Sequence, residues 1–269
     1  MERGNTSAGD AMKSDTLGPV ARTLQLLQAL AEAAEPLSLT QLATQLDLPS
    51  STVHRLLKLL RERGFVEADP ESRRYRVGWE FFRVGALVAA RQPLNEMARP
   101  ILAELTAKCN ENSQLGIYRP DERCMMFVEQ ARSTHHLSFS IPMYSPQPLL
   151  WGCSGRVIVA HLADPVVREL LEQAGPAPAS GAPPPDPDQY ATELRRIRAQ
   201  GWDTTSAEKI ANSVGFAAPV FDANGVVGSI SITIPTLRYH SYQQAQYAEL
   251  VTDAARSLSH SLGYLPTSA

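Results

Sequence analysis

The residues best suited to bind another molecule lie in one short stretch, 50–58. Hydroxyl, imidazole and basic side chains are concentrated there: Ser50, Ser51, Thr52, His54, Arg55 and Lys58. Hydroxyls and unpaired backbone N–H groups at the start of a helix suit a phosphate, and a guanidinium such as that of Arg55 recognises guanine with ~1–3 kcal/mol of discrimination. The stretch therefore has the chemistry of a helix that lies in the major groove of DNA; the alternative is a solvated helix face.

A second set of basic residues, Arg73 and Arg74, follows in a segment that the sequence pattern predicts to be a β-hairpin. Two strand-like runs, 65–68 and 73–77, flank a Pro-containing turn at 69–72. Side chains alternate along a strand, so Arg73 and Arg74 are expected to point to opposite sides. We expect at least one of them to contact a DNA phosphate; the alternative is a solvated hairpin.

The charge of this region differs from that of the whole chain. The chain has 25 Lys and Arg against 28 Asp and Glu, a net charge of -3. Between Ser50 and Arg83 there are eight basic and five acidic residues, so the local charge is positive. The overall charge gives no support for nucleic-acid binding, which must depend on this local excess.

Three predicted helices position these groups. The first shows apolar residues at steps of three and four, and its inward stripe is predicted to be Val20, Leu24, Leu27, Leu30 and Ala31, with the helix ending before Pro36. Ser38 is a plausible N-cap for a short second helix that begins at Thr40. The third begins near Ser50, buries Val53, Leu56, Leu57 and Leu60, and stops at Gly64, which tolerates positive φ. Three helices and a hairpin make a winged helix-turn-helix over 18–77, preceded by a disordered polar arm at 1–17.

The rest of the chain has a different pattern. A helix over 78–92 leads to a break near Pro93, the expected domain boundary. Beyond it we expect helices and antiparallel strands that do not alternate strictly, which is typical of an α+β sandwich. The predicted helices are 94–109, one capped by Ser154, 190–200 and 242–262; the strands are 114–118, 124–128, 136–141, 217–221 and 226–234; and 174–188 is an exposed Ala/Pro-rich loop.

Metal, cofactor and catalytic sites are not expected. His135 and His136 are adjacent on a predicted strand, so they face opposite sides and cannot hold one metal ion. Cys109, Cys124 and Cys153 form no CxxC pair. The sequence around Ser154 lacks the second Gly of a nucleophile elbow, because Arg156 stands there. Cys153 is either a buried inert thiol, which we favour, or a redox-sensing thiol near a helix start.

The composition fits a protein of two globular domains. Hydrophobic residues make up 43% and charged residues 20% of 269 residues. No apolar run approaches the ~20 residues of a membrane span, and the N-terminus has no apolar signal core. We therefore expect no membrane association and a cytoplasmic location.

Both halves of the chain resemble one family, the IclR family of bacterial transcriptional regulators. The resemblance rests on Leu48-Pro49-Ser50-Ser51-Thr52-Val53-His54-Arg55-Leu56-Leu57, Gly64-Phe65-Val66 and Arg74-Tyr75-Arg76-Val77-Gly78, and in the second half on Ala217-Ala218-Pro219-Val220-Phe221-Asp222 and Ser231-Ile232-Thr233-Ile234-Pro235. It implies a winged helix joined by a linker helix, 78–92, to a GAF-like α/β sandwich that binds an effector and oligomerises, 93–269. It also implies homodimers, assembled as dimers of dimers into homotetramers, on double-stranded operator DNA.

The resemblance also implies where a small organic acid would bind. Ser231 and Thr233, two apart on a strand and therefore on the same side, match family positions that hydrogen-bond an effector carboxylate. Backbone N–H groups at 152–155, at a helix start, are expected to hold the same anion. The chain departs from the family at Cys153, where Ala is usual, at Gly215, where several relatives carry Cys, and in the loop around Met143.

These considerations give two sets of site residues. The DNA-binding set is Thr40, Ser50, Ser51, Thr52, His54, Arg55, Lys58, Arg73 and Arg74. The effector set is Phe139, Met143, Leu149, Trp151, Gly152, Cys153, Gly215, Ser231 and Thr233. The bulky members favour an aromatic or apolar organic acid, although core packing is an equal alternative for Phe139 and Trp151.

The sequence thus predicts a ligand-responsive transcriptional regulator, repressor or activator, of an organic-acid or aromatic catabolic operon, with no catalytic activity. The alternative is an enzyme that acts on a small organic acid and carries a DNA-targeting module. A third possibility is a nucleic-acid-binding scaffold with a degenerate sensor. The absence of a nucleophile–base set, a metal motif or a phosphate motif argues against the enzyme.

Overall fold

The computed structural model describes residues 18–89 and 93–264. The arm predicted at 1–17 and the last residues of the 78–92 segment lie outside the described residues. The chain divides into two compact units, Met1–Arg91 and Gln92–Ala269, which are considered separately.

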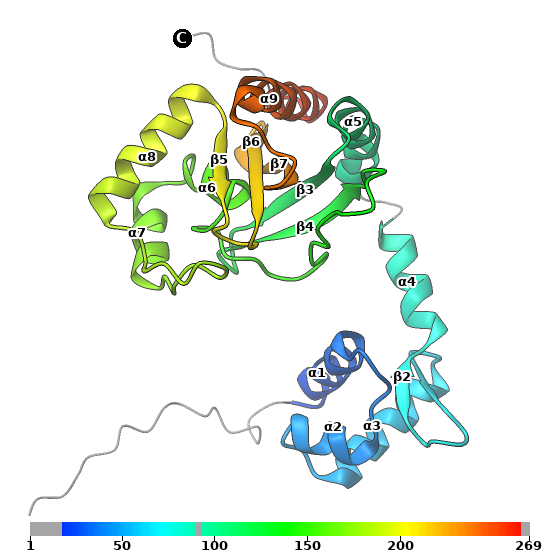
Figure 1. Ribbon diagram of the computed structural model, residues 1–269. Helices are drawn as coiled ribbons and strands as arrows, with labels where there is room; N and C mark the ends of the chain where they lie inside the picture. The colour runs from blue at the N-terminus through cyan, green and yellow to red at the C-terminus, as the bar shows by residue number, and fades with distance from the viewer. Residues whose placement is uncertain (1–17, 90–92, 265–269) are drawn as a thin grey trace, which may run out of the picture. The chain divides into compact units, whose positions relative to one another are not determined.

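The N-terminal unit contains the predicted three helices and hairpin, followed by a fourth helix (Figure 1). Its elements are α1 (Pro19–Glu32), α2 (Leu39–Gln45), α3 (Ser50–Glu62), β1 (Val66–Ala68), β2 (Tyr75–Val77) and α4 (Trp79–Ala89). β1 and β2 pair antiparallel, with Glu67 opposite Arg76. This arrangement confirms the winged helix-turn-helix.

Local signals in the sequence account for the bounds of α2 and α3. The Ser38 hydroxyl accepts a hydrogen bond from the backbone N–H of Gln41, and the side-chain oxygen of Gln41 accepts one from the backbone N–H of Ser38, so the two residues form a capping box. α3 buries Val53, Leu56, Leu57 and Leu60 as predicted. Gly64, at φ 74°, lies just beyond its end. Leu37 pairs with Tyr75 through both backbone hydrogen bonds, which attaches the hairpin to the loop before α2.

The predicted inward face of α1 was only partly right, since Leu30 is buried and Leu27 packs against the core. The buried residues are Leu26, Ala29 and Leu30, whereas Val20 is 74% and Leu24 57% exposed. The helix carries Leu on two faces, and both sets follow the spacing of three and four residues. The sequence pattern therefore did not distinguish the face that packs on α3 from the face that does not.

The C-terminal unit is built on a five-stranded antiparallel sheet with the order β4-β3-β7-β6-β5. Its elements are α5 (Pro93–Cys109), β3 (Asn112–Arg119), β4 (Cys124–Ala131), α6 (Cys153–Val159), α7 (Asp164–Glu172), α8 (Pro187–Gln200), β5 (Asp203–Ser206), β6 (Ser213–Asp222), β7 (Gly225–Pro235), the 3-10 turn η2 (Ser241–Gln243) and α9 (Gln244–Ser261). β6 and β7 form the predicted hairpin, but its two turn residues are Ala223 and Asn224, because Asp222 already pairs with Gly225, the first residue of β7.

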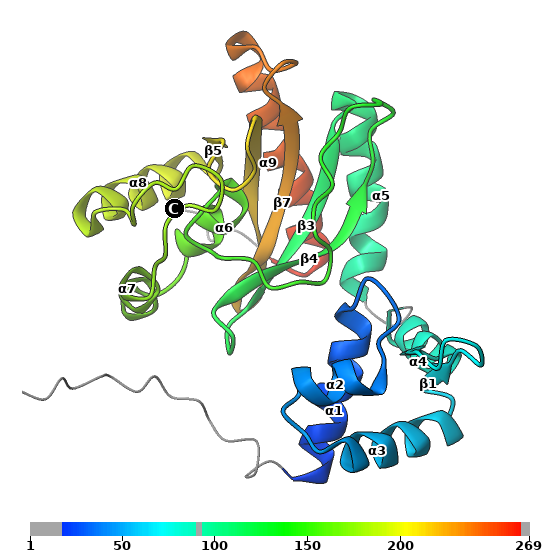
Figure 2. The ribbon, with the colours of Figure 1, turned by 60° about the horizontal axis from the view of Figure 1, so that its bottom comes forward.

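Helices cover both faces of this sheet (Figure 2). α5 and α9 lie side by side on one face, over a core that includes Leu115, Phe216 and Ile232. α6 lies against the other face, where Phe127 and Ala217 point, and α8 packs outside α6. Alternation along the strands places Gly215, Ser231 and Thr233 on the α6 side.

Four predictions for this unit were incomplete or wrong. Residues 136–141 form no strand; instead Tyr144 and Gln147 make backbone bonds to the edge strand β4. β5 and α7 were not predicted, and β5 is a polar edge strand without apolar alternation. α6 is preceded by Gly152 rather than capped by Ser154, which lies inside the helix. The Ala/Pro-rich loop is mostly exposed, but Ala177 within it is buried.

Candidate DNA interface and effector cavity

The exposed face of α3 carries the polar and basic residues predicted to bind DNA. Ser50, Ser51, His54, Arg55 and Lys58 are exposed, and Thr52 is half-buried. The helix starts after Pro49, has no acidic residue in its first turn and has no side-chain cap. The N–H groups of Thr52 and Val53 already donate to the carbonyl oxygen of Pro49, whereas those of Ser50 and Ser51 precede the first helical hydrogen bonds, so this end of α3 offers donors and a positive dipole to a phosphate.

The other members of the predicted DNA-binding set lie on neighbouring elements. Thr40 is exposed in the first turn of α2. Arg73 is exposed but lies in the hairpin turn at φ 53° rather than on β2, so the predicted strand alternation from Arg73 to Arg74 was wrong. Arg74 donates from Nη1 to the carbonyl oxygen of Pro36 at 2.9 Å, so its guanidinium also holds the hairpin to the body of the unit.

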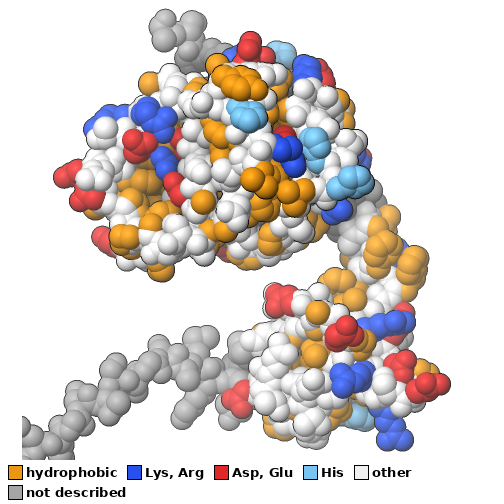
Figure 3. Space-filling view, viewed as in Figure 1, with side chains coloured by type: hydrophobic (Ala, Val, Ile, Leu, Met, Phe, Trp, Pro, Cys, Tyr) orange, Lys and Arg blue, Asp and Glu red, His pale blue; other side chains and the backbone are white. Residues whose placement is uncertain are grey.

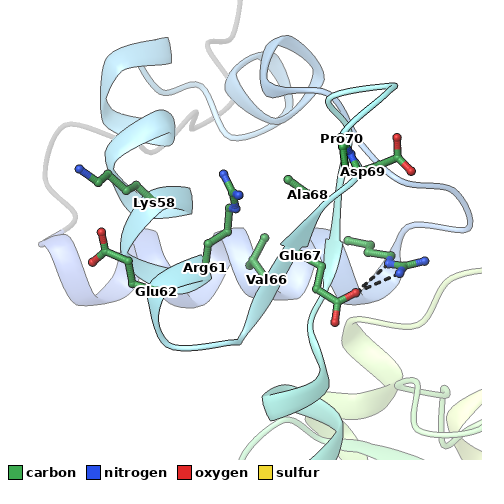
Figure 4. Close-up of a pocket in the computed structure, with 9 residues that line it drawn as sticks. Lys58, Arg61, Glu62, Val66, Glu67, Ala68, Asp69 and Pro70 are labelled. Carbon is green, nitrogen blue, oxygen red and sulfur yellow. Dashed lines mark hydrogen bonds and ion pairs between the residues drawn. The ribbon is translucent and has the colours of Figure 1, made fainter.

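A hollow of about 700 Å3 separates the last turns of α3 from the hairpin (Figure 4). Lys58 and Arg61 line it from α3, and residues 66–70 and Arg76 line it from the hairpin. The acidic residue Glu67 engages Arg76 through bonds of 3.1 and 3.0 Å. Arg61 was not in the predicted site, although its position three turns after Ser50 places it on the exposed face.

The charge of this unit is mixed rather than uniformly basic. On the face that Figure 3 presents, Lys and Arg side chains are interspersed with Asp and Glu side chains. Several of the acids are paired, as Glu80 is with Arg83 at 2.6 Å, and that contact lowers the pKa of Glu80. Electrostatic attraction to phosphate must therefore come from individual cations on α3 and the hairpin rather than from a broad field.

The C-terminal unit contains a cavity of about 340 Å3 between the sheet and the start of α6, here called the α6 cavity. It brings together residues from β4, the loop before α6, α6 itself, the loop after β5, and β6 and β7. Those that matter below are Phe127, Ile141, Pro148, Gly152, Cys153, Thr205, Glu208, Lys209, Gly215 and Thr233.

The cavity includes some of the predicted effector residues and leaves others out. Gly152, Cys153, Gly215 and Thr233 line it. The remaining five do not line it. Leu149 is buried in the core and Ser231 in the sheet, while Met143 and Phe139 are half-buried. Trp151 donates from Nε1 to the carbonyl oxygen of Gly175 at 3.1 Å. Sequence spacing therefore located the cavity wall but not all of its members.

Ser231 and Thr233 share one neighbour, Gln114 of β3. Their hydroxyls lie 3.3 and 3.5 Å from its Oε1, while its Nε2 is buried without a partner among the described residues. The amide oxygen and nitrogen are assigned from such contacts, so a rotated Gln114 would donate to both hydroxyls. In that rotamer the buried Nε2 gains partners, and the hydroxyl proton of Thr233, which lines the cavity, is free to turn toward an anion, whereas Ser231 stays buried in the sheet.

The backbone N–H groups at the start of α6 are already occupied, which corrects the predicted anion site at 152–155. Gly152 N–H donates to Glu208 Oε2, and Cys153 N–H donates to Thr205 Oγ1, both at 3.0 Å. Arg156 binds Glu208 from the other side, at 3.2 Å, and also binds Asp203 at 2.9 Å. The protein's own carboxylate thus fills the place expected for the carboxylate of an effector.

Cys153 has the environment of a structural thiol. It is buried against β6, and burial raises its pKa to about 12. The nearest part of β6 is Gly215, where an added Cβ would come within 2.7 Å of the Cys153 sulfur. A thiol of this kind is almost entirely protonated at neutral pH, so the redox-sensing alternative loses its chemical basis.

Most residues that line the α6 cavity were missing from the predicted site, among them the polar residues Thr205, Glu208 and Lys209. These three come from 203–212, a segment whose strand was not predicted. The one available signal for them was the adjacent acid–base pair Glu208-Lys209.

Within 18–89 and 93–264, no group of three or more His, Cys, Asp or Glu is arranged to hold a metal ion. No described helix is both long and apolar enough to cross a bilayer.

Comparison with known proteins agrees with this architecture. The family model for the IclR helix-turn-helix domain matches residues 19–70, and that for the bacterial transcriptional regulator IclR C-terminal domain matches residues 86–260. The regulator BhcR of Paracoccus denitrificans is 30% identical over 96% of this chain and 91% of its own length. The transcriptional repressor IclR of Escherichia coli is 27% identical over 90% of this chain and 89% of its own length.

A solved structure shares the fold. The crystal structure of an IclR homolog from Microbacterium hydrocarbonoxydans, complexed with 4-hydroxybenzoate, superposes with a TM-score of 0.79 at 20% identity, over 91% of this chain and 99% of that one. The helix-turn-helix implies DNA binding, and the C-terminal domain implies effector binding. Together the matched segments, the two-unit architecture and the relatives establish that the chain belongs to the IclR family of transcriptional regulators.

Proposed function

We propose that the protein controls a metabolic operon by binding operator DNA through α3 and the hairpin, and that a small organic acid in the α6 cavity regulates this binding. The observation that carries the proposal is the division of α3 into two faces. One face buries four apolar residues in the unit, while the other exposes hydroxyl, imidazole and basic groups. A helix of this kind stays folded while its polar face reads DNA. The protein would act in the bacterial cytoplasm, where its operator is found.

The proposed ligand is an organic acid with an apolar or aromatic body. The α6 cavity combines apolar residues such as Phe127, Ile141 and Pro148 with a few polar groups such as Thr233. Its volume of about 340 Å3 lies at the lower end of the range for small-molecule sites, ~300–1,000 Å3. The 4-hydroxybenzoate complex of a homolog with this fold supports the same class.

The proposed assembly is a homodimer, with two dimers forming a tetramer. α4 exposes Trp79 (68%), Phe82 (63%) and Leu87 on the surface of the N-terminal unit. The rings of Trp79 and Phe82 lie 5.1 Å apart and so form one apolar patch. A patch of this kind on a DNA-binding unit is suited to a second copy, because a two-fold dimer places two α3 helices on the two halves of a palindromic operator.

The test of the proposed function is an operator titration at fixed salt. DNA from upstream of the protein's own gene would be titrated with the wild type, Arg55→Ala and the matched control Arg132→Ala, an exposed residue of the other unit. We expect Arg55→Ala to weaken binding about 10- to 100-fold, since it removes a contact worth ~1–3 kcal/mol, and to leave thermal stability unchanged.

Arg132→Ala should bind like the wild type. Equal affinity of Arg55→Ala and the wild type would exclude a contact role for Arg55. The absence of any specific DNA fragment bound by the wild type would count against the proposed function as a whole.

A further inference from the structure

We propose that Lys209 binds the carboxylate of the effector through an ion pair inside the α6 cavity. This inference rests on the proposed function, because it names the charged contact within the same ligand site. Lys209 lies in the loop 207–212 between β5 and β6, and it lines the cavity together with Gly152, Cys153 and Thr233. None of the residues predicted from the sequence supplied a positive charge to this cavity.

The ammonium of Lys209 is incompletely satisfied. Nζ donates one hydrogen bond, at 3.2 Å, to the carbonyl oxygen of Pro148, and it lies 6.0 Å from the centroid of the Phe127 ring. Among the described residues it forms no ion pair with a carboxylate. An ammonium has three donors, so donor capacity remains for a ligand in the cavity.

The nearest acid cannot serve as its partner. Glu208 is adjacent in the sequence, but its Oε2 accepts from Gly152 N–H at 3.0 Å and its Oε1 accepts from Arg156 at 3.2 Å. Cys153, which faces Lys209 from α6, is a neutral thiol at physiological pH. The positive charge of Lys209 is therefore not neutralised by a direct contact, whereas the negative charge of Glu208 is.

Burial makes this charge costly without an anion. Removal from solvent lowers the pKa of Lys209 to about 8, against the opposing influence of Cys153 and Glu208. A charged group in such a place is stabilised by an opposite charge within ~4 Å. The attraction between the two charges becomes stronger as solvent is excluded from around them. A bound carboxylate would supply that charge, so the cavity favours an anionic ligand over a neutral one of the same shape.

The surroundings define the body of this ligand. The Phe127 ring, Ile141 and Pro148 form an apolar wall beside the ammonium, and Thr233 adds a hydroxyl. Gly152 has φ 77°, and an added Cβ would meet the Lys209 stem at 3.4 Å, so the glycine lets the stem lie close to the start of α6. The position of the ammonium next to Phe127 suits an aromatic carboxylate whose ring packs on the apolar wall.

The experiment measures binding of defined carboxylates and their neutral amides to the full chain. Benzoate and 4-hydroxybenzoate would be compared with benzamide and 4-hydroxybenzamide by calorimetric titration, and acetate would probe the carboxylate alone. The variants are Lys209→Met, which keeps the stem without the charge, and Lys209→Arg, which keeps the charge. Lys108→Met is the matched control, since Lys108 is exposed and pairs with Glu104 on α5.

We expect the wild type to bind an aromatic carboxylate and to bind its amide at least about 10-fold more weakly, as loss of a charged hydrogen bond implies. Lys209→Met should lose about 10- to 100-fold in carboxylate affinity, whereas Lys209→Arg retains most of it and Lys108→Met is unchanged. Benzoate affinity of the wild type should also decline as pH rises from 7 to about 9.5, because the ammonium deprotonates, while Lys209→Arg should show no such decline.

Equal carboxylate affinity of Lys209→Met and the wild type would overturn the inference, as would the failure of every carboxylate in the panel to bind the wild type. An operator titration of Lys209→Met, with and without the acid, distinguishes a wrong assignment of Lys209 from a wrong proposed function. If the inference is correct, Lys209→Met still binds the operator but no longer responds to the acid. If only the inference is wrong, Lys209→Met binds the operator and responds like the wild type.

Discussion

At the residue scale, Gly215 and Cys153 form a complementary pair across the contact between β6 and α6. The Cys153 sulfur occupies the space that a Gly215 side chain would fill, at 2.7 Å from an added Cβ. We therefore expect Gly215→Ala to destabilise the C-terminal unit by about 1–3 kcal/mol, the usual result of overpacking. The thermal unfolding midpoint, followed by tryptophan fluorescence, measures this loss.

The control for this prediction is the double variant. Cys153→Ala removes the sulfur, so Gly215→Ala should cost much less in that background, which gives a coupling free energy between the two positions. Additive effects of the two substitutions would show that the clash is not the cause of the destabilisation.

Lys209 leads to a prediction about stability rather than affinity. In the folded protein its pKa is about 8, whereas an unfolded lysine titrates near ~10.4. Below pH 8 both states carry the proton, and the folded state bears the cost of a charge that is only partly exposed to solvent. Between about 8 and 10.4 the unfolded state binds more protons, so the stability of the wild type rises with pH. Lys209→Met should consequently be more stable than the unliganded wild type near pH 7, by on the order of 1–2 kcal/mol since the residue is partly exposed.

This advantage should shrink as the pH approaches about 10.4. Thermal unfolding midpoints of the wild type and Lys209→Met, measured from pH 6 to 10 without ligand, give the comparison. A difference that does not change with pH would mean that packing of the methionine, and not the buried charge, sets the stability.

At the element scale, the sequence was most informative where a local signal defines both the type and the limits of an element. α3 has an apolar stripe of helical period and ends beside Gly64, and the Asn224-Gly225 pair marks the β6–β7 hairpin to within one residue of its turn at 223–224. Such signals act within a few residues and need no knowledge of the rest of the fold.

Elements whose structure depends on distant neighbours were predicted poorly. The edge of the sheet beside β4 is taken by 144–147, so the apolar residues of 136–141 found no strand to pair with. β5 is polar and becomes a strand only by pairing with β6. On α1 two apolar stripes compete, and the packing of α3 decides between them.

In the candidate sites, too, local features were predicted from the sequence and long-range ones were missed. The residues of α3 proposed to bind DNA are local to one helix, so the sequence placed them on one face. The α6 cavity combines segments far apart in the chain; Lys209 and Pro148, for example, are 61 positions apart. No local pattern could bring Lys209 into the cavity, nor indicate that Glu208 and Thr205 occupy the N–H groups at the start of α6.

At the scale of the whole molecule, DNA recognition depends on how many copies act together. A single winged helix reads one half-site, whereas a palindromic operator requires two helices at a fixed spacing. Trp79 and Phe82 of α4 are large and exposed, and each aromatic side chain buries ~150–250 Å2 when it enters an interface. Removal of the two aromatic side chains from each protomer should therefore weaken dimerisation at least about 100-fold.

The variant Trp79→Ser/Phe82→Ser tests this by sedimentation of the full chain over a range of concentrations. Leu237→Ser is the matched control, because Leu237 is 87% exposed and lies outside the N-terminal unit. The double variant should dissociate to smaller species and lose operator affinity more steeply than half-site affinity, since each monomer still has an intact α3. If the double variant sediments like the wild type, α4 does not carry the dimer contact. If it dissociates but binds the full operator as tightly as before, each winged helix binds its half-site independently of the partner.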